Sequence, residues 1–183
     1  MVVYGPLKVE GVENVPRKGG LFISANHISD ADPLAIGAAT PRELHYMAKE
    51  ELFSIPVMGT LMRWANAFPV KPRSADRAAL RKAEGLVQSG KAVVIFPEGQ
   101  SSETGEMQSF LPGVALLAKK AGVPIVPAGI IGTRRIIPYG SVIPRPAFRR
   151  VIVRFGKPLV FSKDEDTKEI LERLRQAVAE LIK

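Results

Sequence analysis

The chain contains no cysteine among its 183 residues. Disulfide bonds, thiolate metal sites and a cysteine nucleophile are therefore excluded. The two histidines, His27 and His45, stand 18 positions apart and form no metal-ligand pattern with the scattered carboxylates. Nucleotide-binding loops of the G-x-x-x-x-G-K-S/T and G-x-G-x-x-G types are also missing. We therefore expect neither a metal ion nor a cofactor, and we assign His45 a structural role.

Apolar segments long enough to span a membrane are missing as well. The longest uncharged, mostly apolar stretch is residues 121–133, which contains two prolines, whereas a spanning helix needs about 20 apolar residues. Residues 1–10 lack the basic-then-apolar order of a signal peptide. The sequence thus predicts no transmembrane segment and a protein that stays in the cytoplasm.

Basic residues outnumber acidic ones by 26 to 18, which gives a formal charge of +8. The excess is concentrated in residues 63–82 and 134–157. A basic surface favours nucleic acid, phosphorylated ligands or an anionic membrane, although a merely solvated surface is the simplest alternative. Nucleic acid is disfavoured, because aromatic residues make up only 7% and no DNA- or RNA-binding signature is present. We expect peripheral association with the anionic inner face of the cell membrane.

Gly- and Pro-marked breaks separate short β-rich apolar runs from helical patterns, which predicts one α/β domain over residues 1–183. Asp32 and Ser74 are expected to cap helices, and Ser162 with Glu165 is expected to form a capping box. Strands are predicted within residues 1–10 and at 21–25, 68–70, 92–96, 123–131 and 151–155. Helices are predicted at 34–39, in two pieces at 49–65, after Ser74, at 112–121 and at 162–183.

The predicted helices at 49–65 share a large apolar face, made of Leu52, Phe53, Val57, Met58, Leu61, Met62 and Trp64. Burial of this face in the core is the default explanation. Contact with a membrane, assisted by the basic stretches, is the alternative.

Polar residues follow three of the predicted strands, at 26–32, 71–73 and 96–99. Ligands of an open α/β sheet bind beyond the carboxyl ends of its strands. His27 is followed closely by Asp30 and Asp32, and a neutral imidazole can accept a proton from a hydroxyl when its other nitrogen donates to a carboxylate. The residues alone leave open a capping role for Asp32 and a plain loop role for His27.

Residues 26–32 (NHISDAD) resemble the N-H-x-x-x-x-D block of the glycerolipid acyltransferases, the PlsC-like family that includes lysophosphatidic acid acyltransferase. Residues 96–99 (FPEG) and 123–127 (VPIVP) resemble two further blocks of that family. Residues 66–73 (NAFPVKPR) resemble the block that ends in a phosphate-contacting arginine. The resemblance covers residues 8–161, with the blocks in the family's order.

This resemblance implies a mainly parallel central sheet flanked by helices, as in glycerol-3-phosphate acyltransferase. It also implies an acyl-CoA or acyl-carrier-protein donor and a lysophospholipid acceptor, lysophosphatidic acid. His27 would be the general base and Asp32 its orienting partner, in direct transfer without an acyl-enzyme. Glu98 and Gly99 would help to hold the acceptor. Asn26, Pro97 and Pro124 would support the site.

The sequence departs from the family pattern at two positions that concern phosphate binding. Residues 100–102 (QSS) replace the usual T-R-S after FPEG, and Pro72 stands where the other arginine usually falls. We therefore assign the phosphate of the acceptor, lysophosphatidic acid or glycerol 3-phosphate, to Arg73, with Lys71 or Arg77 assisting. Another lysolipid or hydroxyl acceptor is one alternative. A thioester or ester hydrolase is another, because the same histidine could activate water.

Overall fold

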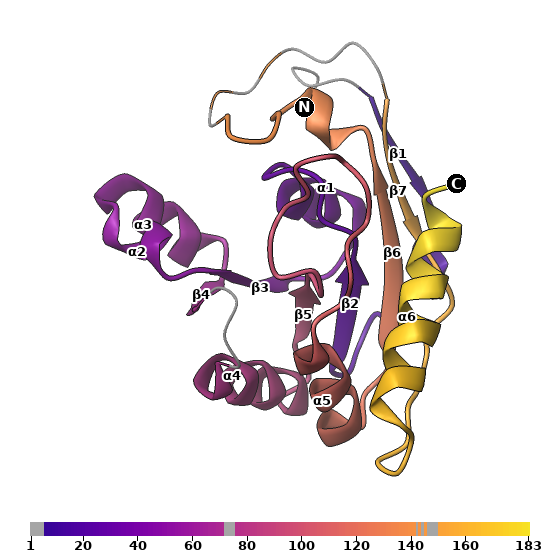
Figure 1. Cartoon of the computed structure of the whole chain (residues 1–183). Coiled ribbons are helices and arrows are strands. Elements are labelled where there is room, and N and C mark those ends of the chain that lie inside the picture. The colour runs from indigo at the N-terminus through magenta and orange to yellow at the C-terminus, as the bar shows by residue number, and fades with distance from the viewer. Residues whose placement is uncertain (1–5, 72–75, 142, 144, 146–149) are drawn as a thin grey trace.

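The computed structural model of this chain describes residues 6–71, 76–141, 143, 145 and 150–183. Within these residues, seven strands form one sheet and six α-helices surround it (Figure 1). The strands are β1 (Leu7–Glu10), β2 (Leu21–Ala25), β3 (Leu44–Lys49), β4 (Ala67–Val70), β5 (Ala92–Ile95), β6 (Ile125–Ile131) and β7 (Val151–Phe155). The helices are α1 (Asp32–Ala39), α2 (Glu51–Ser54), α3 (Pro56–Trp64), α4 (Arg77–Gln88), α5 (Pro112–Ala121) and α6 (Thr167–Leu181), with short 3₁₀ turns η1 (Val12–Asn14) and η2 (Thr133–Arg135).

The strands follow the order β1-β7-β6-β2-β5-β3-β4 across the sheet. The five strands from β6 to β4 run parallel to one another, whereas β7 is antiparallel to β6 and β1 is parallel to β7. The prediction of an α/β fold with a mainly parallel sheet is therefore confirmed. Ser24 of β2 pairs with Ile95 of β5, so these strands end side by side. The segments that follow them start at the same edge.

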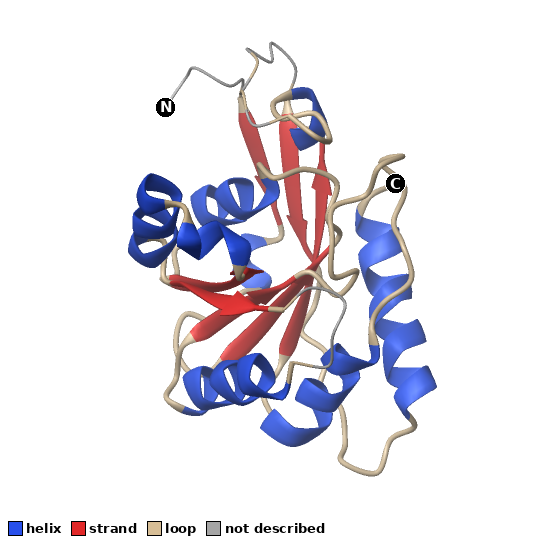
Figure 2. Ribbon diagram, turned by 60° about the vertical axis from the view of Figure 1, so that its left-hand side comes forward, coloured by secondary structure: helices blue, strands red, loops and turns tan. Residues whose placement is uncertain are grey.

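Helices cover both faces of the sheet (Figure 2). On one face, α4, α5 and α6 bury Leu117 and Leu174 against Phe22 of β2. On the other face, α1 buries Ile36 against Ile23, the next residue of the same strand. Successive side chains of a strand point to opposite faces, so a strand covered on both sides is apolar throughout. This explains why β2 is a continuous apolar run apart from Ser24.

Local signals locate most of these elements correctly. The helix predicted at 112–121 is α5, which Pro112 opens and Gly122, with a φ of 61°, ends. The two-piece helix is observed as α2 and α3, divided before Pro56. The strand β3 is absent from the sequence prediction. It pairs with β5 on one side and β4 on the other, so neighbouring strands define it rather than its own composition.

The predicted helix caps are corrected by the structure. Asp32 is the first residue of α1 and its side chain does not cap the helix. α6 begins at Thr167, later than expected, and its N-cap is Asp166 rather than Ser162. The carboxylate of Asp166 accepts hydrogen bonds from the backbone amides of Lys168 and Glu169 in the first turn of α6. The Ser162 hydroxyl accepts one from the amide of Asp164, which lies before the helix. Ser74 lies outside the described residues, and the described N-cap of α4 is the side chain of Asp76.

The apolar face of the two short helices is not buried as a whole, which corrects the core-packing prediction. Val57, Leu61 and Trp64 of α3 are exposed, whereas Met58 and Met62 are partly buried. The α2–α3 pair contacts β3 and β4 near one end of the sheet and stands apart from the helical layers (Figure 1). α3 therefore has one partly buried side, which carries the two methionines, and one exposed side.

Removing the Asp166 cap should destabilise the fold. Asp166→Ala leaves two amides of α6 without their acceptor, and we expect the free energy of unfolding to fall by about 1 kcal/mol. Urea denaturation followed by circular dichroism measures this change. Ser162→Ala serves as the control and should cost less than half as much. The reverse order would restore Ser162 as the cap.

Candidate active site

Two polar segments meet at the carboxyl edge of the sheet, where β2 and β5 end. The backbone amide of His27, after β2, donates to Oε1 of Glu98, after β5, over 2.8 Å. A cavity of about 1890 Å³ opens beside them, and its lining includes His27 and apolar residues of α1, α3 and α5. Ligands of open α/β sheets bind at such an edge. We therefore take this region as the candidate active site.

The carboxylate of Asp32 is fully buried and makes four hydrogen bonds. Its Oδ2 accepts the backbone amides of Ile28 at 2.7 Å and Ser29 at 2.9 Å, and lies 2.9 Å from Nδ1 of His27. Its Oδ1 accepts the hydroxyl of Thr133 at 2.5 Å. Burial of a carboxylate is tolerated when its oxygens are satisfied in this way. Asp32 thus holds the loop before α1 and the ring of His27 together.

The imidazole of His27 is held on two sides. Nδ1 donates to Asp32, since an ionised carboxylate can only accept hydrogen bonds, and this leaves the lone pair on Nε2. Phe96 stacks on the ring, with centroids 4.2 Å apart and planes 24° from parallel. Asp30 is exposed, and no hydrogen bond joins it to this ring. The geometry therefore pairs His27 with the second of the two nearby aspartates.

Glu98 is buried below the site and does not line the cavity. Besides the His27 amide, it accepts the amide of Gln108 at Oε2 over 2.9 Å. Burial raises the pKa of the Glu98 carboxyl group, although the two backbone hydrogen bonds oppose that shift. Pro97 and Gly99 belong to the turn that carries it, and Gly99 has a φ of 75°, which favours glycine. Glu98 therefore joins three main-chain segments around the site.

The other predicted site residues are placed differently. Asn26 exchanges two hydrogen bonds with the backbone of β6, which ties the end of β2 to its neighbour. Lys71, Pro97 and Gly99 line the cavity. Arg73 lies outside the described residues. Pro124 lies at the opposite edge of the sheet, near the start of β2, so the structure does not bring it to the site.

Sequence reasoning does not find Thr133, which is fully buried and donates to Asp32. The sequence feature that could have pointed to Thr133 is its position in the chain. It follows Gly132, whose φ is 91°, directly after β6, and β6 is the strand beside β2. A residue that follows a parallel neighbour of β2 lies at the same edge of the sheet, but the register is needed to place it.

The part of the chain that the structure describes contains neither a metal-binding cluster nor a membrane-spanning helix. No group of His, Cys, Asp and Glu there could hold a metal ion. In the same part of the chain, no helix has the length and apolar character needed to cross a membrane. His45 lies in β3, and burial lowers the pKa of its imidazole.

A partly buried histidine paired with a fully buried aspartate, at the carboxyl edge of a mainly parallel sheet, defines the class of this protein as an α/β domain with a His–Asp site. Residues 6–131 match the protein family described as Acyltransferase, and the chain belongs to this family. The likeness to PlsC-like proteins inferred from the sequence is thereby confirmed.

Two relatives show the extent of the similarity. The chain is 33% identical over 177 residues to the chloroplastic 1-acyl-sn-glycerol-3-phosphate acyltransferase BAT2 of Brassica napus, over 91% of this chain and 50% of that protein. It is 32% identical over 129 residues to the 1-acyl-sn-glycerol-3-phosphate acyltransferase of Bacillus subtilis, over 70% of this chain and 64% of that protein. The chain thus spans half of the first relative and less than two thirds of the second.

A solved structure agrees with the fold. The crystal structure of the 1-acyl-sn-glycerophosphate (LPA) acyltransferase PlsC from Thermotoga maritima matches with a TM-score of 0.77 at 30% identity. The match covers 98% of this chain and 73% of that chain. The two chains therefore share the same overall fold over nearly the full length of this chain.

The role of Glu98 can be tested through stability. Glu98→Gln keeps the shape of the side chain but replaces one acceptor oxygen by an amide donor. One backbone amide then loses its partner, and we expect the free energy of unfolding to fall by about 1–3 kcal/mol in chemical denaturation. Glu106→Gln, at an exposed position in a nearby loop, is the matched control and should change it by less than about 0.5 kcal/mol. Equal stability of the two variants would contradict the structural role of Glu98.

Proposed function

We propose that this chain transfers a fatty acyl group from acyl-CoA or acyl-carrier protein to the free hydroxyl of lysophosphatidic acid, a step of phospholipid synthesis. The observation that carries the proposal is the 2.9 Å pairing of His27 Nδ1 with Asp32 beside a large apolar cavity. Membership of the acyltransferase family supports the reaction class. The relatives named 1-acyl-sn-glycerol-3-phosphate acyltransferases support the acceptor.

In this mechanism, His27 is the general base. Its Nε2 takes the proton of the acceptor hydroxyl while the hydroxyl oxygen attacks the thioester carbonyl carbon. Asp32 holds Nδ1–H and stabilises the imidazolium that forms. As the tetrahedral intermediate collapses, the carbon–sulfur bond breaks and the imidazolium returns the proton to the thiolate. The products are a new ester and a free thiol, and no acyl-enzyme is formed.

The cavity suits substrates with long hydrocarbon chains. Its volume of about 1890 Å³ is above the roughly 300–1,000 Å³ usual for small-molecule sites. Met58, Leu80 and Leu117 come from three different helices and line it, as does His27. Each buried methylene group contributes about 0.8 kcal/mol to binding. An acyl chain could therefore supply most of the affinity, while the polar edge of the sheet positions the reacting atoms.

Hydrolysis is the competing reaction, because a water molecule at Nε2 of His27 could attack the same thioester. The products separate the two functions. Acyl-CoA is incubated with a panel of lysolipids, and the products are identified by mass spectrometry. Acylated acceptor in excess of free fatty acid supports the transferase, and free acid alone would identify a hydrolase.

Loss of the His–Asp pair should abolish turnover without unfolding the protein. His27→Ala removes the general base, and we expect kcat for acyl transfer to fall by about 10²- to 10⁴-fold, with a comparable loss in Asp32→Asn. Thiol release measures the rate, and circular dichroism checks the fold. Asp30→Asn is the matched control and should stay near the wild-type rate. Wild-type turnover in His27→Ala, or a larger loss in Asp30→Asn than in Asp32→Asn, would contradict the mechanism.

The acceptor phosphate provides a second test. We propose that Arg73 binds it, with Lys71, which lines the cavity, assisting. A charge-assisted hydrogen bond contributes about 1.5–3 kcal/mol, so Arg73→Ala should lower kcat/KM for lysophosphatidic acid by about 10- to 150-fold. Lys71→Ala should act in the same direction, and Lys168→Ala, at an exposed position of α6, is the control. Monoacylglycerol, which has no phosphate, should be used equally well by all variants. An equal loss of kcat/KM with both acceptors would show that neither Arg73 nor Lys71 binds the phosphate.

A further inference from the structure

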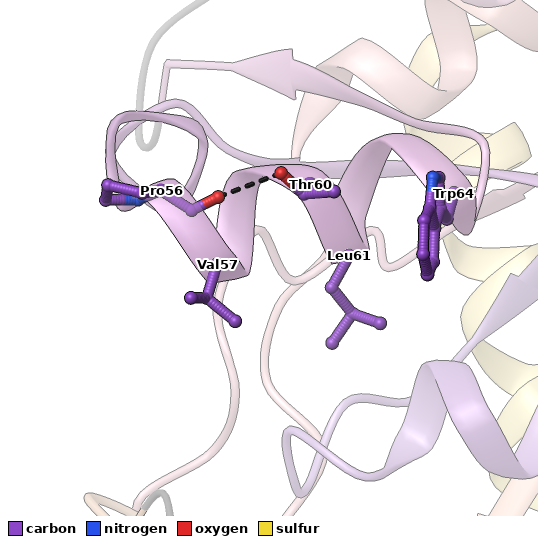
Figure 3. A pocket seen from close by; sticks show the side chains of 5 residues that line it. All are labelled: Pro56, Val57, Thr60, Leu61 and Trp64. Carbon is purple, nitrogen blue, oxygen red and sulfur yellow. Dashed lines mark hydrogen bonds between the residues drawn. The ribbon is translucent and has the colours of Figure 1, made fainter.

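Helix α3 carries a row of apolar side chains that no described element covers. Val57 and Trp64 each keep 82% of their surface exposed, and Leu61 keeps 51%. Residues three or four apart share one side of a helix, and Figure 3 shows these three side chains pointing to the same side. We call Val57, Leu61 and Trp64 the α3 ridge. Exposed apolar side chains gathered in one place mark interaction sites on protein surfaces.

The surface along the ridge is open. A hollow of about 440 Å³ runs beside it and is bordered by α3 alone, through Pro56, Val57, Thr60, Leu61 and Trp64. The hydroxyl of Thr60 donates to the carbonyl of Pro56 over 2.9 Å, so this polar group is satisfied within the helix (Figure 3). Apart from the exposed indole N–H of Trp64, the side chains of the ridge are therefore apolar.

The ridge is continuous with the candidate active site. Leu61 borders both the hollow and the cavity that contains His27, and Met58 and Met62 line that cavity from the neighbouring side of α3. Gly59 keeps the helix in this orientation, because a Cβ there would lie 2.4 Å from the carbonyl oxygen of Phe53 in α2. α3 thus presents one side to the catalytic cavity and the adjoining side to the exterior.

We propose that the α3 ridge docks on an anionic lipid bilayer, so that lipid substrates enter the catalytic cavity past Leu61. Charge favours this partner, since the chain carries a formal +8 and Lys49 and Lys71 line the cavity at the ends of β3 and β4. Arg63 is exposed on α3 itself. Trp64 suits the membrane–water interface, where Trp places its apolar ring and its polar N–H. The passage of substrate rests on the proposed function, whereas the docking does not.

Trp64 is the only tryptophan of the chain, so its fluorescence reports on the ridge directly. The full chain is titrated with vesicles of phosphatidylcholine and phosphatidylglycerol, and separately with phosphatidylcholine vesicles. We expect the emission to shift to the blue, more strongly with the anionic vesicles, and lipids brominated on their acyl chains should quench it. An unshifted emission with both kinds of vesicle would overturn the proposal.

A matched pair of variants tests the position of the docking surface. Val57→Asp should weaken binding to the anionic vesicles by about tenfold or more, the factor that corresponds to the burial of one valine side chain. Val160→Asp is the control, because Val160 is also exposed, at 65%, but follows Leu159, which pairs with the start of β6 at the opposite edge of the sheet. Equal weakening in both variants would reject α3 as the docking element.

Activity separates this proposal from the proposed function. Val57→Asp should lower the rate with a long-chain acceptor held in vesicles and leave the rate with water-soluble short-chain substrates unchanged. Vesicle binding without transfer to any acceptor would refute the function alone and leave the docking standing. An emission shift that depends on protein concentration in the absence of lipid would show that a second copy covers the ridge, and would overturn the docking.

Discussion

The buried carboxylate of Asp32 is the interaction on which the candidate site depends. Transferring an ionised carboxylate from water without partners is prohibitively costly, so the fold must bring several donors to it. Two of them are amides of the loop after β2, one is the ring of His27, and one is the hydroxyl of Thr133 after β6. The position of β6 beside β2 in the sheet is therefore a condition for the geometry of His27.

A second buried carboxylate, Glu98, serves a different purpose. Asp32 orients the ring of His27, whereas Glu98 holds the main chain that carries this ring and joins it to the loop at Gln108. Both oxygens of Glu98 are engaged by backbone amides, while Gly99 and Lys71 line the cavity. These two residues are thus the nearer candidates for contact with the acceptor. Direct contact between Glu98 and the acceptor stays a prediction.

Most of the fold could be predicted because its strongest signals are local. β2 is a nearly continuous apolar run, and α5 has proline at its start and glycine after its end. The errors arise where local rules do not decide between alternatives. β3 is defined by pairing with β4 and β5, and the cap of α6 is one of several Ser and Asp residues that local rules rank alike.

The sequence by itself determined the chemical groups of the site and their order, because motif residues must follow particular strands to reach one edge of a parallel sheet. The family resemblance already marked Asp32 as the partner of His27, and the structure supplies the contact between them. Only the tertiary structure decided that Thr133 completes the pair and that the ridge of α3 faces outward. Residue spacing brings groups near one another within a loop. The direction of each side chain depends on donors and packing partners that strand pairing supplies from more than 100 residues away, as for Thr133 and Asp32.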